Sequence, residues 1–458
     1  MSTAIQQVGN YLETFTEFAK SAADQKLPWL RKLREDAFAR FCETGFPTTH
    51  DEDWRFTNVS PIARTQFVFG KQQKAFSNND LTPWTITGAA AQLVFIDGRF
   101  APPLSNSANL PGVQIRSLKD QIASKPTDLE AHLGKYANIQ RDAFCALNTA
   151  FLEDGAFVHV RRATVLEQPV HLLFVSIESE TPTMSHPRNL VVFEDESQGT
   201  VIEEYVSMGK GAALSNSVTE LIVGENATVS HYMIEREHRD AFNVSTLRIQ
   251  QARSANVASH SLLLGGGLVR NNVHPVLAGA GGECLINGLF VGDGRQHLDN
   301  YMYVEHAKPH CSSRQFYNGI LDGHAHGVFH GRIIVHKDAQ KTDAKQTNRN
   351  LLLSDDAQID TKPQLEIYAD DVKCTHGATI GQIEENALFY LQSRGIDEIS
   401  ARRLLLLAFA GECLDRMKPG LARDHAERLI RKHLVSFAHH RSRTPAAGKK
   451  ERSWEEVG

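Results

Sequence analysis

Short apolar and β-branched runs recur through the central half of the chain at an almost constant interval, with turn residues between them. Between about Ala156 and Gly381, more than 200 residues, no helical periodicity intervenes. The predicted strands lie at Phe157–Val160, His171–Ile177, Leu190–Phe193, Val201–Val206 and Leu221–Val223, and further strands begin near Glu283, Gln296, Cys311, His326, Thr342, Gln358 and Val372, about 15 residues apart. A strand that recurs at a fixed period without helices is typical of a stacked β-solenoid. An antiparallel β-sandwich also has regular short strands, but this helix-free stretch is long for one sandwich. We therefore expect a mainly β protein whose core, residues 151–381, is a right-handed parallel β-helix.

Helical patterns flank this core on both sides. We expect residues 1–150 to form an N-terminal α/β region of mixed, largely helical structure, residues 382–440 a C-terminal helical domain, and residues 441–458 a disordered tail. The predicted flanking elements are helices at Pro28–Phe41, Asp142–Leu152, Glu384–Arg394, Ala401–Met417 and Ala422–Ala438, and a strand at Ala91–Phe95 before a turn at Asp97-Gly98. Ser400 is the predicted N-cap of the helix over 401–417.

Composition excludes several classes of protein. The net charge of −5 and the pI near 6.5 argue against a general nucleic-acid-binding surface, which is normally basic. The longest apolar run, Leu404 to Ala410, is far shorter than the roughly 20 residues that span a bilayer. The first residues have no basic segment followed by an apolar core, and six scattered cysteines do not form a disulfide framework. We therefore expect a cytoplasmic protein with reduced thiols that binds neither nucleic acid nor membrane.

Cys374 and His376 are the strongest candidate metal ligands. They are two residues apart in a predicted strand, where residues i and i+2 project from the same face. A thiolate and an imidazole suit iron, zinc or an Fe–S cluster. Two ligands cannot close a tetrahedral site, so donors are needed from elsewhere, for example from another chain. A buried cysteine beside a hydrogen-bonded histidine is the commoner explanation of such a pair.

The remaining chemical signals are weaker. Four histidines, His324, His326, His330 and His336, fall on even positions, but Gly327 and Gly331 predict turns or bulges that break the alternation, so a polar ladder is favoured over a ligand cluster. Cys284 and Cys311 are predicted to be buried, and the runs 265–267 and 279–282 to be tight corners. The chain has no phosphate-binding loop, no nucleophile elbow and no His-Glu-x-x-His motif. We therefore expect a protein that is not an enzyme.

Three stretches carry a resemblance to a known family. The stretches are Gln346–Ser354, Leu365–Thr379 with its Cys-Thr-His-Gly element, and Phe389–Ile396. They resemble the SufB/SufD family of Fe–S cluster assembly proteins, and the Cys-Thr-His-Gly form resembles the SufD branch. The resemblance is strong from about residue 140 to 415, and Gly45-Phe-Pro and Glu52-Asp-Trp-Arg-Phe56 extend it weakly toward the N-terminus.

The resemblance implies a scaffold subunit of the SUF complex, which builds or loads Fe–S clusters. Its implied partners are a SufB-like homologue, paired through the β-helix, and a SufC-like ABC ATPase, bound through the C-terminal helices. His376 is then the residue expected to meet iron or a transient cluster at the subunit interface, with Cys374 second, as ligand or neighbour. The helix over 401–411 is apolar nearly all round and must be buried, by itself in the fold or against a partner. The resemblance favours the partner, with Leu405 and Phe409 as contacts.

Two other functions stay open at this point. A β-solenoid enzyme acting on carbohydrate needs clustered carboxylates, but in a strand the neighbours Asp370 and Asp371 face opposite sides. The chain is also considered as the principal, SufB-type scaffold. Gly377, where that branch has a Glu-His-Glu pattern, and the lack of a cysteine-rich N-terminal stretch argue against it.

Overall fold

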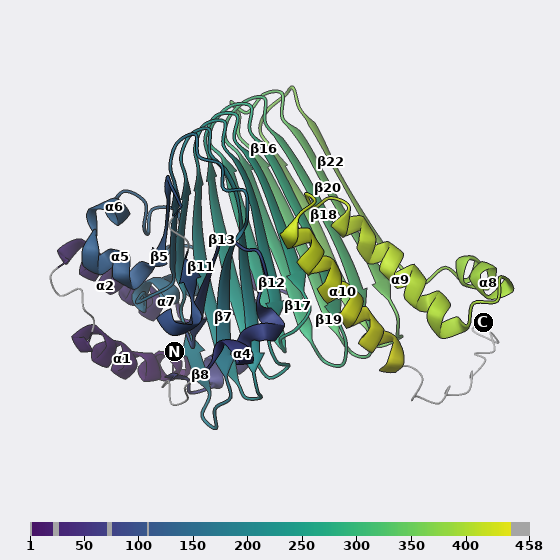
Figure 1. Cartoon of the computed structure of the whole chain (residues 1–458), viewed down its shortest axis with the longest axis horizontal. Helices are drawn as coiled ribbons and strands as arrows, with labels where there is room; N and C mark the ends of the chain where they lie inside the picture. The colour runs from purple at the N-terminus through teal and green to yellow at the C-terminus, as the bar shows by residue number, and fades with distance from the viewer. Residues whose placement is uncertain (1, 22–26, 71–75, 108–109, 441–458) are drawn as a thin grey trace, which may run out of the picture.

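The protein is a two-sheeted parallel β-solenoid with helices at both ends of the chain (Figure 1). The computed structural model describes residues 2–21, 27–70, 76–107 and 110–440. The predicted disordered tail, residues 441–458, lies outside the described residues. Within them, no helix is both long enough and apolar enough to cross a bilayer.

From β9 onward, consecutive strands of the core alternate between the two sheets, whereas β8 and β9 both pair with β11. The strands are β6 (Ala156–Val160), β7 (Val170–Ile177), β8 (Thr183–Ser185), β9 (Arg188–Phe193), β10 (Gln198–Met208), β11 (Ala213–Val223), β12 (Thr228–Arg236), β13 (Phe242–Gln251), β14 (Asn256–Leu263), β15 (Leu268–Leu277), β16 (Glu283–Gly292), β17 (His297–His306), β18 (Ser312–Leu321), β19 (His326–Val335), β20 (Asp343–Leu352), β21 (Gln358–Ile367) and β22 (Lys373–Gly381). One sheet runs in the order β21-β19-β17-β15-β13-β11-β9-β6-β5, and the other in the order β22-β20-β18-β16-β14-β12-β10-β7-β2-β3. The predicted parallel β-solenoid is confirmed. Asp343 pairs with Lys373, the residue 30 positions later, so the predicted spacing of about 15 residues between strand starts corresponds to half a turn of the solenoid.

One corner of the solenoid explains why the turns stack at a regular interval. Successive turns place there a single residue with positive φ: Glu196, Asn226, Ser254, Gly281, His310 and Lys341. The N–H of each donates to a carbonyl oxygen of the next turn, as from Asn226 to Arg253 at 3.0 Å and from Lys341 to Asp371 at 2.7 Å. These bonds satisfy the corner backbone, which strand pairing does not reach.

The solenoid buries side chains on both faces of its sheets. In β12, Val229 and Met233 point into the interior core, while Tyr232 and Ile234 pack under the C-terminal helices. Strands covered on both sides need apolar residues on both sides, so they appear in the sequence as continuous apolar runs. Cys284 and Cys311 lie in the interior core, and the glycine runs 265–267 and 279–282 form corners between strands, as predicted.

The N-terminal region covers the outer face of the sheet that contains β11. Its elements are α1 (Ser2–Ser21), α2 (Pro28–Thr44), η1 (Glu52–Trp54), α3 (Ser60–Arg64), β1 (Val68–Phe69), α4 (Asn78–Leu81), η2 (Thr82–Trp84), β2 (Ala91–Ile96), β3 (Arg99–Phe100), η3 (Pro102–Leu104), β4 (Asn106–Ser107), β5 (Val113–Ser117), α5 (Leu118–Ser124), α6 (Thr127–Glu130) and α7 (Ala143–Ala150). Phe144 and Phe151, at the start of α7 and just beyond its end, share a core with Leu214 and Val244 of the sheet. Strands β2 and β5 pair with β7 and β6, so residues 1–150 also extend both sheets of the solenoid.

The C-terminal helices are α8 (Glu385–Ser393), α9 (Glu398–Leu414) and α10 (Leu421–His440). Of these, α9 and α10 lie along the outer face of the other sheet, and α8 packs against α9 away from the sheet (Figure 1). The predicted N-cap of α9 is wrong: Asp397 caps the helix by accepting a hydrogen bond from the N–H of Ser400 at 3.0 Å. Both residue types are good caps, and here the one three residues earlier starts the helix.

Candidate functional site

The solenoid ends in two strands whose outer edges are unpaired among the described residues. β21 pairs only with β19, and β22 only with β20. Figure 1 shows β22 at the end of the sheet, beyond β20 and far from the helices α1 and α2. Both sheets therefore stop at the same end of the molecule. Exposed edges of this kind are ready templates for pairing with another chain.

The register shows which backbone groups of β22 are free. The N–H of Lys373 donates to the carbonyl oxygen of Thr342 at 2.8 Å, so Lys373 faces its neighbour within the chain. In a parallel strand, alternate residues direct their backbone groups to opposite sides. The N–H and C=O groups of Cys374, His376, Ala378 and Ile380 therefore face the open edge.

Cys374 and His376 share one face, as the spacing predicts. Cys374 lies beside Ala344 and His376 beside Gln346, and both of these neighbours are buried inside the solenoid. The pair therefore faces the interior at its open end. Cys374 is half-buried against the interior core, whereas His376 has no further layer above it and is exposed.

The chemistry of the pair is incomplete by itself. Burial, together with the nearby charge of Asp343, raises the pKa of the Cys374 thiol, and a backbone hydrogen bond only partly opposes this. A bound metal would displace the thiol proton. Within the described residues, no group of three or more His, Cys, Asp and Glu side chains converges on a possible metal site. Cys374 and His376 therefore fit half of a soft-metal site, with further donors required from outside the described residues.

The other histidine candidates do not converge. His326 lies 2.7 Å from Asp360, His324 lies 3.7 Å from Asp356, and His336 lies 2.7 Å from Glu305. His330 faces Gln364 from the same strand as His326, while His324 and His336 lie beyond the ends of β19. The four side chains bond to separate partners, as in a polar ladder.

The adjacent carboxylates do not form a catalytic pair. Asp370 and Asp371 lie in the turn between β21 and β22. Asp371 forms an ion pair with Lys341, one turn earlier in the solenoid. This removes the observation on which a carbohydrate-active site would rest.

Leu405 and Phe409, the predicted partner contacts, lie largely within the fold. Phe409 is 9% exposed and packs against the solenoid, with the guanidinium of Arg349 5.4 Å from its ring. The side-chain amide of Asn318 donates to the Phe409 carbonyl oxygen at 2.8 Å. Leu405 is half-buried in a groove of about 410 Å³ between α9 and the end of β22. Of these two residues, Leu405 alone is partly accessible to a partner.

A different apolar surface is exposed on the same helices. Phe389 and Tyr390 of α8 are 71% and 57% exposed, and Ile399 and Leu404 of α9 are also exposed. We call these four residues the α8–α9 patch. The sequence predicts the helix over Glu384–Arg394 and the family resemblance of 389–396, but the exposed surface was missed, although two adjacent aromatics on a short helix are a signal of a contact surface.

Almost the whole chain matches known proteins of one family. The SufBD core domain of the SUF system for FeS cluster assembly matches residues 174–409, and the SufBD protein N-terminal region matches residues 5–172. An iron–sulfur cluster assembly SufBD family protein of Synechocystis is 36% identical over 383 residues, 81% of this chain and 84% of the relative. The iron–sulfur cluster assembly protein SufD of Escherichia coli is 32% identical, over 82% of this chain and 86% of the relative. SufD of Bacillus subtilis is 28% identical, over 90% of this chain and 95% of the relative.

Proposed function

We propose, from the premise that this chain belongs to the SufBD family of the SUF iron–sulfur cluster assembly system, that it is a SufD-type scaffold subunit without catalytic activity of its own. It pairs with a SufB-like homologue through the open end of the solenoid, binds a SufC-like ATPase through its C-terminal helices, and acts in the cytoplasm. The observation that carries this proposal is the pair of free edges, β21 and β22, at one end of the molecule.

The two free strand edges favour a homologous protein as the partner. A second solenoid of the same family would end in two edges at a comparable separation, so both sheets could continue across the interface. The side chains at this end also need a cover: Ile367, Tyr368 and Ile380 are exposed large apolar residues. Strand addition would satisfy the free backbone groups and bury these side chains together.

The cluster is the cargo of this complex, and Cys374 with His376 would meet it at the interface. Both residues lie on β22, so a partner strand along this edge would bring its own donors next to them. An imidazole is a weaker donor than a thiolate, which suits a cluster that must be handed on.

The exposure of the α8–α9 patch supports this surface as the binding site of the ATPase. Its four apolar side chains are exposed on the helices that the resemblance assigns to the ATPase, whereas the buried apolar side chains of α9, such as Leu406 and Phe409, pack against the solenoid. The proposed dock is therefore the outer surface of α8 and the start of α9, with Leu405 at its border.

Proline at Ala378 tests the strand-addition interface. The Ala378 N–H faces the open edge, so proline removes a donor that the isolated chain does not use. The variant should melt like the unmodified protein but fail to co-purify with a SufB-like partner. As a matched control, proline at Thr379 removes a donor directed at β20 and should lower the melting temperature of the isolated chain. Undiminished co-purification of the Ala378→Pro variant would exclude the β22 edge as the interface.

A further inference from the structure

Gln346 begins the first of the three stretches that carry the family resemblance, and the proposed function gives it no role. It lies in β20, the strand next to β22, and is 1% exposed. Its register partners are Gln315 of β18, one turn earlier, and His376 of β22, at the open end. All three residues face the interior of the solenoid, because in neighbouring strands residues in register share a face. Gln346 is therefore the lateral neighbour of the proposed cluster ligand within its own chain.

The side-chain amide of Gln346 is held in one orientation. Its nitrogen, Nε2, donates to Oε1 of Gln315 at 2.9 Å. The side chain also lies across Gly331 of β19, where a Cβ atom would overlap Nε2 and the amide carbon. Glycine at position 331 thus leaves the space that the amide occupies. Because the nitrogen points back to the preceding turn, the oxygen of the amide lies on the side of the next turn.

This oxygen, Oε1 of Gln346, lacks a hydrogen-bond donor. It is buried, and no group among the described residues donates to it. A buried amide oxygen without a donor is costly, so native structures nearly always supply one. In the part of the chain that the structure describes, only β21 and β22 lie beyond this turn of the solenoid. The donor is therefore to be sought on these two strands.

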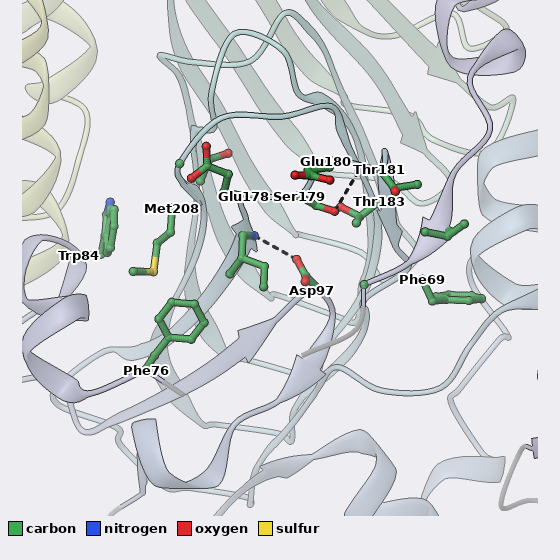
Figure 2. Close-up of a pocket in the computed structure, with 15 residues that line it drawn as sticks. Phe69, Phe76, Trp84, Asp97, Glu178, Ser179, Glu180, Thr181, Thr183 and Met208 are labelled. Atoms are coloured by element: carbon green, nitrogen blue, oxygen red, sulfur yellow. Dashed lines mark hydrogen bonds between the residues drawn. The ribbon is translucent and has the colours of Figure 1, made fainter. Parts of the chain in front are cut away.

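A second buried oxygen without a partner has a different environment. Asp97 lines a pocket of about 1160 Å³ beside the first strands, and its Oδ1 accepts from the N–H of Ile177 at 3.1 Å (Figure 2). Its Oδ2 has no partner among the described residues, and a Cβ atom at Gly70 would overlap it. Oδ2 is therefore enclosed by backbone, which cannot supply a donor by a side-chain movement. Gln346 differs because the next turn carries an exposed side chain beside it.

That exposed side chain is His376. A neutral imidazole always carries one N–H, and an exposed ring changes rotamer readily. The register step from Gln346 to His376 is the same as the step from Gln315 to Gln346, which a side-chain hydrogen bond bridges. A second donor in the last turn is the hydroxyl of Thr361 in β21, which is also buried without a partner among the described residues.

We propose that Gln346 is a positioning residue for His376. The imidazole turns inward, donates one ring N–H to Oε1 of Gln346, and is thereby fixed in one tautomer. Its other ring nitrogen then carries the lone pair and is presented at the open end, where the cluster is bound. Metal-ligating histidines usually donate their second N–H to an oxygen in this way. The consequence for the cluster rests on the proposed function, whereas the hydrogen bond itself belongs to this chain alone.

The hydrogen bond is tested by NMR on the full-length protein with ¹⁵N-labelled histidine, without partner or iron. The resonance that disappears in His376→Gln is that of His376. At about pH 8.5, well above the usual imidazole pKa of about 6.5, the two-bond ¹⁵N–¹H correlations show which ring nitrogen carries the proton. We expect one tautomer in the unmodified protein and a mixture in Gln346→Met, because a thioether is a weak acceptor. Equal tautomer populations in the two proteins would overturn the proposal.

Gln346→Glu is the rescue variant, because it keeps an oxygen acceptor at the same place. The amide of Gln315 can turn over and donate its own Nε2, which has no partner among the described residues. The single tautomer of His376 should therefore return. If Gln346→Glu behaves like Gln346→Met, the oxygen of Gln346 is not the acceptor.

Two control variants separate positioning from a general loosening of the open end. Asn348 is as buried as Gln346 and donates to the Tyr317 carbonyl oxygen at 3.2 Å, but it lies beside Ala378. Asn348→Leu should lower the melting temperature and leave the single tautomer of His376 unchanged. Thr361→Val, which removes the other donor, should also leave it unchanged. Loss of the single tautomer in either control, to the extent seen in Gln346→Met, would contradict the role of Gln346.

The consequence for the cluster is measured as iron and sulfide content of the complex reconstituted with a SufB-like partner and the ATPase. Removing the partner of a metal-bound histidine typically lowers metal affinity about 10–100-fold, so Gln346→Met should hold less cluster and Gln346→Glu should recover it. In the His376→Ala background, Gln346→Met should cause no further loss, because both act through one ligand. Additive losses would refute the positioning role. Unchanged content in His376→Ala alone would instead refute the ligand role in the proposed function, and the NMR result would still decide whether Gln346 fixes the ring.

Discussion

Nε2 of His425 lies 2.9 Å from Oε2 of Glu204, and this contact ties helix α10 to strand β10 across 221 residues of sequence. Both side chains are buried, Glu204 completely. His171 lies 3.2 Å from the same carboxylate oxygen, and Arg236 lies 2.8 Å from the other one. Burial raises the pKa of Glu204, but the imidazoles of His171 and His425 outweigh this and hold it well below its usual value. The C-terminal helices are thus attached to the solenoid by a buried charge as well as by apolar packing.

Glu204→Gln should destabilise the fold strongly. The substitution keeps the shape but leaves the buried part of Arg236 without its counter-charge, at a cost of about 3–5 kcal/mol. Urea or thermal unfolding of the isolated protein measures this. The control is Glu194→Gln, which removes the partly exposed pair of His159 and Glu194 and should cost about 1 kcal/mol or less. Equal effects of the two variants would mean that the buried cluster does not anchor α10.

His376→Ala should leave the isolated protein as stable as before. His376 is exposed, so its removal opens no cavity and strands no buried partner. If His376 is a cluster ligand, the reconstituted complex should assemble but hold less iron and sulfide. Thermal melting of the variant and the Fe–S content of the complex are measured together. His336→Ala, which removes another exposed histidine, serves as the control and should leave cluster content unchanged. Normal cluster content in His376→Ala would eliminate the ligand role.

The α8–α9 patch and the buried part of α9 should respond differently to charge. Replacing Phe389 and Tyr390 with Asp should abolish ATPase binding without changing the melting temperature, because both side chains are exposed. Phe409→Asp should instead lower the stability by several kcal/mol, because the carboxylate would enter a packed interior. Pull-down of the ATPase and thermal melting of each variant distinguish the two. ATPase binding that survives in the Phe389→Asp/Tyr390→Asp variant would place the dock elsewhere.

The solenoid should lose stability in mild acid because it buries neutral imidazoles. Burial lowers the pKa of His186 and of His260 to about 3, and the pKa of His306 to about 4. These values lie below those of the unfolded chain, so between about pH 6.5 and the folded values the unfolded chain binds protons that the folded chain does not. The stabilisation is complete above about pH 6.5 and is lost as the pH falls.

The variant His260→Gln isolates one of these groups. Its amide oxygen can replace Nδ1 of His260 as the acceptor for Asn287 Nδ2. The slope of unfolding free energy against pH, measured by urea titration between pH 6 and pH 4.5, should fall by about 1.4 kcal/mol per pH unit relative to the unmodified protein. The exposed His324→Gln control should leave the slope unchanged. An unchanged slope in His260→Gln would mean that His260 is already protonated in the folded protein.

Local periodicity was enough to predict the architecture of the core. The strand starts expected near Cys311, Thr342 and Val372 are observed at Ser312, Asp343 and Lys373. Each solenoid strand pairs with a strand one turn away, so every turn needs the same pattern of apolar strand residues and turn residues. This pattern therefore recurs along the sequence at a fixed interval. The family could also be recognised from the sequence, because the motifs that carry the resemblance are contiguous stretches such as Leu365–Thr379.

The environment of single side chains was decided by the tertiary structure. Cys374 and His376 could be placed on one face from their spacing, but their position at an open end follows from the sheet order, in which β22 is the last strand among the described residues. Phe409 and Phe389 are the same residue type on neighbouring helices, yet one is covered by the solenoid and the other is exposed. Asp97 reads in the sequence only as a turn residue, but its carboxylate is buried because Gly70 and Ile177 approach it from two other segments. Sequence determines what repeats along the chain, because backbone pairing and alternation are local, whereas burial and charge at a single atom depend on residues that only the folded chain brings together.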